Sequence, residues 1–255
     1  MPFQKITPEK LSHAVVRQIE QLILRGILRP GERLPAEREL AERMGVSRPS
    51  LREAIATLTE AGLVTPRAGA GLYVADVLGS AFSPALIRLF AAHDEAVFDY
   101  IAFRRDLEAL AARRAADMAS DADLATIDAI FTKMEAASGK RNAEDEARLD
   151  AEFHMAIIEA SHNVVMLHMM RAMFELLREG VFYNRGVMFK QRTSRGALLD
   201  QHRAINTALQ QRDAPAAEAA VIAHLDYVEA ALSAQQKIDH NAEVAAQRLE
   251  HERAR

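Results

Sequence analysis

The stretch RGILRPGERLPAERELAERMGVSRPSLREAIATLTE, residues 25–60, decides the fold of the first part of the chain. Pro30 and Gly31 interrupt the helical pattern before them, because proline and glycine are strong helix breakers. A second helix is expected over residues 35–44, with proline in its first turn. Gly45 closes this helix, since glycine tolerates the positive φ of a helix end. A short helix followed by a tight turn is therefore predicted.

The turn leads into a third predicted helix, over residues 48–60. Ser47 is a good N-cap for it, and Pro49 fits its first turn because that position needs no backbone N–H donor. Farther along, residues 63–65 and 72–74 are short, apolar and partly β-branched runs around a glycine-rich turn. Such runs predict a small β-hairpin.

Helical periodicity also predicts a helix over residues 10–26, ahead of the break. Three helices and a hairpin within residues 1–75 form the outline of a winged helix-turn-helix. These residues hold 11 Lys and Arg against 8 Asp and Glu, whereas the remainder of the chain holds 21 against 28. We call residues 1–75 the head. A basic head followed by an acidic remainder suits a protein in which only the head binds the phosphates of a nucleic acid.

Polar and basic side chains gather in the first turns of the third predicted helix. In a helix-turn-helix these turns enter the major groove, where arginine can bond guanine bidentately. The sequence from residue 25 to residue 74 closely resembles the GntR family of bacterial regulators, including its hairpin GAGLYV at residues 69–74. The resemblance implies binding of double-stranded DNA. It points to these contact residues: Arg38, Ser47, Arg48, Pro49, Ser50, Arg52 and, in the wing, Gly69.

The rest of the chain reads as helical, with alanine, leucine and methionine at helical spacing. Helices are predicted over residues 94–119, 121–138, 144–160, 163–189, 196–211 and 214–235. They indicate an antiparallel all-helical domain over residues 84–235, so the fold class is mainly α. Residues 76–83 are expected to form a linker, and the charged, helix-prone residues 236–255 a frayed C-terminal tail.

Four motifs in this second part resemble the helical FCD ligand-binding domain of the FadR subfamily. They are Phe103-Arg-Arg-Asp-Leu-Glu108, Asp150-Ala-Glu-Phe-His154, Gln201-His202 and Ala223-His224-Leu225. The run EASHNVVMLH, residues 159–168, looks most like the regulators that respond to lactate and pyruvate. The resemblance implies that this domain binds a small carboxylic acid and forms the dimer.

One carboxylate and three imidazoles form a candidate metal site. Asp150 and His154 are four residues apart, so they project from one helix face. His202 and His224 lie on two later helices that an antiparallel bundle can bring opposite them. Such a set suits Zn, Ni or Mn, with coordination positions left for water or a ligand. The resemblance implies that these four bind the metal and that the carboxylate of the acid completes its coordination.

Arg104 is the candidate residue for binding that carboxylate, because guanidinium and carboxylate form strong bidentate pairs. Its position four residues before Glu108 leaves a second interpretation open, in which Arg104 forms only an ion pair with that glutamate.

These patterns predict a DNA-binding transcriptional regulator, most simply a repressor, controlled by a small carboxylic acid. A homodimer on a palindromic operator is expected, because one head reads too few bases. Two alternatives stay open: the same regulator with an acyl-CoA or another metal-independent effector, and a metal-dependent enzyme carried on a DNA-binding head. Recognisable catalytic motifs are absent, so no enzyme is expected. The chain has no cysteine, signal peptide or membrane-length apolar run, which favours the cytoplasm and no membrane partner.

Overall fold

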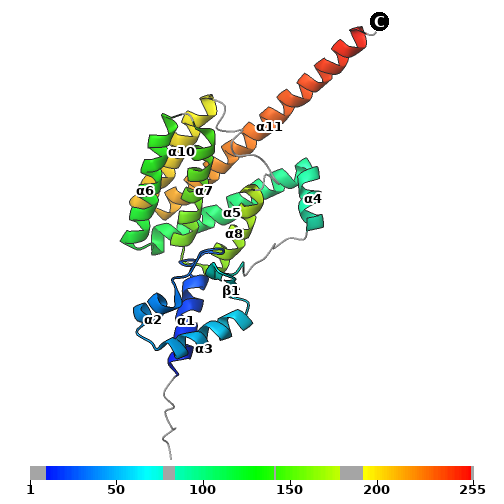
Figure 1. The fold of residues 1–255 in the computed structure, drawn as a ribbon. Coiled ribbons are helices and arrows are strands. Elements are labelled where there is room, and N and C mark those ends of the chain that lie inside the picture. Colours follow the sequence, from blue (N-terminus) through cyan, green and yellow to red (C-terminus); the bar gives the residue numbers. More distant parts are fainter. Residues whose placement is uncertain (1–9, 77–83, 141, 179–191, 254–255) are drawn as a thin grey trace, which may run out of the picture. The chain divides into compact units, whose positions relative to one another are not determined.

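The structure, a computed structural model, describes residues 10–76, 84–140, 142–178 and 192–253 (Figure 1). The chain divides into two compact units, Met1–Ala81 and Phe82–Arg255. Most of the predicted linker, residues 77–83, and the end of the helix predicted over 163–189 lie outside the described residues.

In its described part, the first unit contains three helices and one hairpin. The elements are α1 (Leu11–Leu24), α2 (Glu37–Met44), α3 (Arg48–Glu60), β1 (Val64–Arg67) and β2 (Gly71–Val74). The two strands pair antiparallel, with Val64 opposite Val74. Arg33 adds an isolated antiparallel bridge to Tyr73 of β2. The predicted winged helix-turn-helix is therefore confirmed.

Local signals in the sequence set the start of α3. Gly45 takes the left-handed conformation, with φ 64°, at the end of α2. The Ser47 hydroxyl accepts a hydrogen bond from the backbone N–H of Ser50, and Pro49 lies in the first turn. Leu51 and Leu58, both completely buried, fix the opposite face of α3 in the small core of the head.

The described part of the second unit contains helices and no strand (Figure 1). The helices are α4 (Pro84–Ala92), α5 (Asp94–Met118), α6 (Asp121–Ser138), α7 (Ala143–Ala160), α8 (Val164–Arg178), α10 (Arg192–Gln210) and α11 (Ala214–Arg253). The mainly α fold predicted from the sequence is confirmed. Among the described helices, none combines the length and the apolar character that a bilayer span requires.

The core of the bundle lies between α5, α6, α7, α10 and α11. Small residues let the helices approach closely, and aromatic and branched residues fill the remaining space. The completely buried members include Ala112, Ala115, Ile127, Phe153, Ile205, Leu209, Val221 and Leu225. On the outside, Arg105 of α5 pairs with Asp226 of α11 at 2.7 Å, which links the two helices beside the core.

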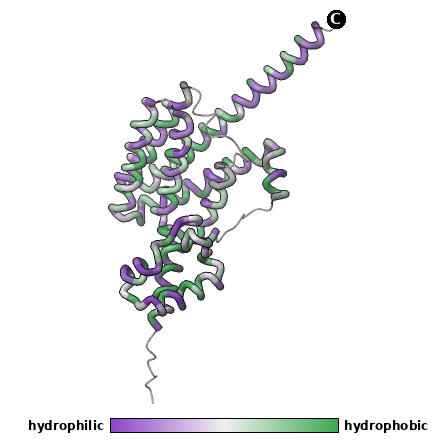
Figure 2. The backbone as a smooth tube through the Cα atoms, in the orientation of Figure 1, coloured by the Kyte–Doolittle hydropathy of each residue, from purple (hydrophilic) through white to green (hydrophobic). Residues whose placement is uncertain are grey.

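Two parts of this unit differ from the prediction. The sequence analysis missed α4 and treated residues 236–255 as a frayed tail, which is wrong for the described residues because α11 continues to Arg253. Residues 236–253 contain neither glycine nor proline and are rich in good helix formers, so propensity favours the continued helix. This half of α11 extends beyond the other helices of the bundle and is mostly hydrophilic (Figures 1 and 2).

The head core generates a stability prediction. Leu51→Ala removes a completely buried side chain, so it should lower the free energy of unfolding of the head by about 2–5 kcal/mol. Leu11→Ala, at a position that is 57% exposed, is the matched control and should change it by less than about 1 kcal/mol. Hydrogen exchange of head peptides in urea measures both; equal losses would contradict the assigned core.

Candidate functional site

The four predicted metal ligands come together in the interior of the bundle. Asp150, His154, His202 and His224 each offer one ligand atom, and these atoms lie within 4.8 Å of one another. All four residues are buried, with at most 6% of any of them exposed. His202 Nε2 lies 3.1 Å from Asp150 Oδ1 and 3.3 Å from His154 Nε2. We call this group the Asp/His cluster.

Three helices position the Asp/His cluster. α7 contributes Asp150 and His154 from one face, as their spacing predicts, and α10 and α11 contribute His202 and His224. The beginning of α7 is fixed by Asn142, whose side chain accepts hydrogen bonds from the backbone N–H groups of the first turn. The rings of His154 and His224 stack at 5.1 Å, and Phe153 meets His202 edge-on at 5.3 Å. An apolar ring therefore covers one side of the cluster.

Two of the histidines are oriented by hydrogen bonds on their other ring nitrogen. His154 Nδ1 lies 2.6 Å from Glu108 Oε2, and His224 Nδ1 lies 3.0 Å from Gln201 Oε1. A carboxylate and an amide oxygen accept, so Nδ1 carries the proton and Nε2 is left as the donor to a metal. This arrangement fits a metal ion held by three imidazoles and one carboxylate.

Burial keeps the imidazoles of His154 and His224 in the form that binds metal. Burial lowers the pKa of His154 against the opposing effect of Glu108, and burial together with the neighbouring His202 and His154 lowers the pKa of His224 well below its usual range. Burial alone raises the pKa of Glu108, but the charge of Arg104, followed by the interaction with His154 and its hydrogen bond, brings it to about 2. Glu108 is therefore a buried carboxylate, and both histidines are neutral at neutral pH.

Arg104, the predicted carboxylate-binding residue, is 1% exposed and pairs with Glu108. Its Nε lies 2.5 Å from Glu108 Oε1 and its Nη2 lies 3.3 Å from Oε2. The ion pair that the sequence left open as an alternative is thus present, while carboxylate binding by Arg104 stays a prediction. The sequence analysis missed Glu108 as a partner of His154. The signal available was the i,i+4 spacing of Arg104 and Glu108, which places both side chains on one face of α5. Gln201, in the motif before His202, was also missed as a partner of His224.

The predicted DNA-contacting residues of α3 lie at its exposed beginning. Ser47, Arg48, Pro49 and Arg52 are exposed, and Ser50 is half-buried behind the cap. Arg52 Nε lies 2.9 Å from Glu37 Oε2 of α2, an ion pair that the sequence analysis did not predict.

The other two predicted DNA-binding residues lie outside α3. Arg38 is on α2, 4.0 Å from Glu42 and strongly exposed. Gly69 is exposed in the turn between β1 and β2, with φ 69°. Neighbouring Arg67 lies over the ring of Tyr73 at 4.2 Å, so the wing arginine rests against its own hairpin.

Comparisons with known proteins address both units. The family model of bacterial regulatory proteins, gntR family, matches residues 11–74, and the FCD domain model matches residues 99–227. A protein of Escherichia coli (strain K12) named for regulation of the L-lactate dehydrogenase operon is 34% identical over 227 residues, 88% of this chain and 86% of that protein. The Glc operon transcriptional activator of the same organism is 33% identical over 79% of this chain and 81% of its own length.

A solved structure supports the same fold. The Streptococcus agalactiae GntR structure matches with a TM-score of 0.52 and 24% identity, covering 86% of this chain and 98% of that one. At this identity the likeness extends to the fold alone.

The buried histidines generate a prediction about pH. The folded-state pKa values of His154 and His224 are lowered from 6.5, so unfolding takes up protons and the metal-free chain should lose stability as pH falls from about 7 to about 5. Glu108, whose pKa is lowered from 4.5 to about 2, contributes stability above pH 4.5 that is lost as pH falls toward 2.

Urea titrations of chelator-treated protein at a series of pH values measure this dependence. His224→Gln should flatten the loss between about pH 7 and pH 5, because one lowered pKa is removed. His240→Gln changes an exposed histidine of the same helix and should leave the profile as it is. Identical profiles for all three proteins would contradict the assignment.

Proposed function

The chain belongs to the GntR family of bacterial regulatory proteins and carries an FCD domain, and from this membership we propose how it works. It is a DNA-binding transcriptional regulator and not an enzyme. In our proposal it acts in the cytoplasm as a homodimeric repressor on a palindromic operator. A small carboxylic acid, lactate or pyruvate being the leading candidates, binds at a metal ion in the Asp/His cluster and changes the affinity for the operator.

Support for operator binding comes from the exposed beginning of α3. Arg48 and Arg52 project there beside the Ser47 cap, in the turns that enter the major groove in this fold. The ion pair of Arg52 with Glu37 is exposed, so it contributes little stability and can exchange for an interaction with DNA. In the absence of DNA, the ion pair with Glu37 limits the conformations of the Arg52 guanidinium. A two-fold dimer doubles the recognised bases into a palindrome.

The observation that carries the proposed sensing role is the Asp/His cluster. Four ionisable side chains converge in an apolar interior, and two imidazoles have their Nδ1 atoms engaged so that Nε2 faces the others. Asp150, His154, His202 and His224 would hold a Zn, Ni or Mn ion. When bound, the metal supplies a Lewis-acid position for a carboxylate. An acyl-CoA effector would leave this buried set without a use.

A small acid is the favoured effector for two reasons. The relative named for the L-lactate dehydrogenase operon shares 34% identity over most of the chain. In addition, the buried guanidinium of Arg104 pairs with Glu108, which in turn contacts the cluster residue His154. A carboxylate at the metal lies in the field of this guanidinium, which Glu108 already orients. The acid can alter DNA binding only through a difference in its affinity for the two arrangements of the dimer.

Arginine substitutions in α3 test the proposed operator binding. Arg48→Ala and Arg52→Ala should each weaken binding to a palindrome selected from random duplexes by about 1–3 kcal/mol if they bind bases. If an arginine binds a phosphate instead, its substitution should reduce the salt slope by about 1. Arg113→Ala, which removes an exposed arginine of the bundle, should change neither. Fluorescence anisotropy at several salt concentrations measures both quantities; wild-type affinity and slope in the double variant would overturn the proposal.

Elemental analysis tests the metal site. Protein purified without chelator should contain one divalent ion per chain, and Asp150→Ala should lower its metal affinity strongly, because it removes the carboxylate ligand. His162→Ala is the matched control, since that histidine is exposed and pairs with Asp123 away from the cluster. Metal-free wild type, even after dialysis against Zn, Ni and Mn, would favour a metal-independent effector.

A further inference from the structure

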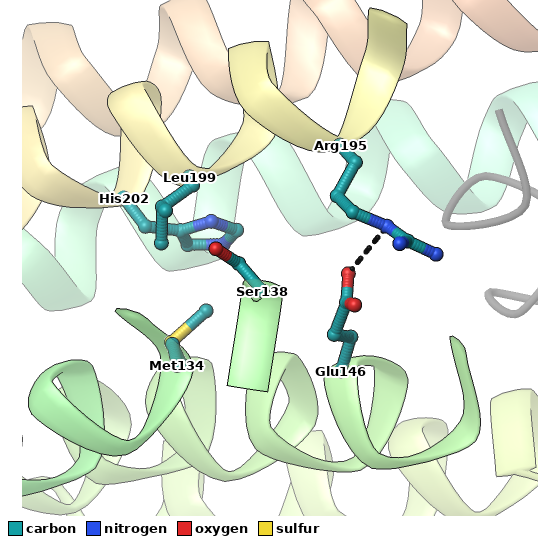
Figure 3. A pocket seen from close by; sticks show the side chains of 6 residues that line it. All are labelled: Met134, Ser138, Glu146, Arg195, Leu199 and His202. Atoms are coloured by element: carbon teal, nitrogen blue, oxygen red, sulfur yellow. Dashed lines mark ion pairs between the residues drawn. The ribbon is translucent and has the colours of Figure 1, made fainter. Parts of the chain in front are cut away.

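A pocket lies beside the Asp/His cluster, between α6, α7 and α10 (Figure 3). Its lining residues are Met134, Ser138, Glu146, Arg195, Leu199 and His202. His202 belongs to both the cluster and the pocket wall, so the two sites share a side chain. We call this hollow the Glu146 pocket.

The Glu146 pocket contains a buried carboxylate oxygen without a partner. Glu146 is 5% exposed, and its Oε2 lies 2.9 Å from Arg195 Nε. Its other oxygen, Oε1, is buried and has no hydrogen-bond partner among the described residues. Leaving a buried carboxylate oxygen unpaired is costly, so a donor from a bound molecule is the expected partner.

A second polar atom of the pocket wall is in the same state. His202 Nδ1 is buried and has no hydrogen-bond partner among the described residues, unlike Nδ1 of His154 and of His224. Metal-binding imidazoles normally donate their remaining N–H to an acceptor. The wall around this pocket therefore has an unfilled acceptor at Glu146 and an unfilled donor at His202.

The helices set the distance between the pocket and the cluster. Glu146 lies one helical turn before Asp150 on α7, and Leu199 lies about one turn before His202 on α10. Residues four apart on a helix face have Cβ atoms roughly 5–6 Å apart. Along both helices, the pocket wall and the cluster are therefore neighbours, and the ring of His202 lies at their boundary.

We propose that the Glu146 pocket binds the hydroxyl-bearing end of a short hydroxycarboxylic acid and that Glu146 is the residue that selects for the hydroxyl group. This inference rests on the proposed function, since it assigns the acid carboxylate to the metal. Met134 and Leu199 supply apolar walls for the carbon chain.

The chemistry of the pocket selects among the possible end groups. A second carboxylate has no proton to donate to Oε1, and an ammonium group is opposed by Arg195, which already neutralises Glu146. An oxo group accepts hydrogen bonds but has no proton to donate to Oε1. A hydroxyl group both donates and accepts, so it satisfies a carboxylate oxygen and an imidazole N–H alike.

Calorimetric titration of the metal-loaded full chain with propionate, L-lactate and 3-hydroxypropionate tests the proposal. At least one hydroxy acid should bind about tenfold more tightly than propionate, since a hydrogen bond to a buried carboxylate adds roughly 1.4 kcal/mol or more. Glu146→Gln should remove most of this preference, because the bond is no longer assisted by charge. Glu152→Gln, at a partly exposed position on the same helix, should retain it.

The outcomes separate the two proposals. If Glu146→Gln keeps its metal, its melting temperature and the full hydroxyl preference, the role of Glu146 is wrong. Acids that bind the wild type without any hydroxyl preference overturn this inference and leave the proposed function standing. If no acid binds the wild type, the proposed acid response itself fails, and this inference fails with it.

A crystal structure of the wild type with metal and 3-hydroxypropionate gives a readout that does not depend on the folding of a variant. The proposal expects the hydroxyl oxygen within about 3 Å of Glu146 Oε1. A water molecule at that position, with the hydroxyl group elsewhere, contradicts it.

Discussion

The rest of the FCD domain depends on one constraint, the burial of a carboxylate and three imidazoles at the centre of a helical bundle. Asp150, His154, His202 and His224 are almost completely withdrawn from water. An uncompensated buried charge costs roughly several kcal/mol, and a buried imidazole needs partners for both nitrogens. The register of α7, α10 and α11 is the one that lets their donor atoms meet. In the proposed function, a divalent cation in the cluster would compensate the cost that this register creates.

Two ion pairs accompany the cluster, one buried and one partly buried, and they give it two chemically different surroundings. Arg104 and Glu108 lie on α5, and Glu108 extends the pair to His154 through a hydrogen bond. Arg195 and Glu146 join α10 to α7 and leave one carboxylate oxygen unpaired. In our account the first pair orients a metal ligand, while the second binds the hydroxyl-bearing end of the acid. A ligand that contacts both ion pairs would therefore connect α5, α7 and α10.

Much of the fold and part of the site could be predicted from the sequence, where the signals are local. Ser47 and Ser120 cap α3 and α6, so the predicted bounds of these helices agree with the structure. The convergence of the four cluster residues followed from one i,i+4 spacing together with a family resemblance. The contacts of Glu37 with Arg52, of Glu108 with His154 and of Glu146 with Arg195 were not predicted, because each depends on which side chain of another helix lies opposite. The continuation of α11 was missed because charge was given more weight than helix propensity.

The most direct test of this account is the free energy of unfolding of the full chain, first stripped of metal and then titrated with Zn²⁺. If the cation compensates the buried cluster, saturation at about 100 times the dissociation constant should stabilise the wild type by roughly 2.7 kcal/mol. A variant that carries alanine at all four cluster positions should show no stabilisation. Equal stabilisation of both proteins, or none in the wild type, would contradict the claim that a metal ion balances the buried carboxylate and imidazoles.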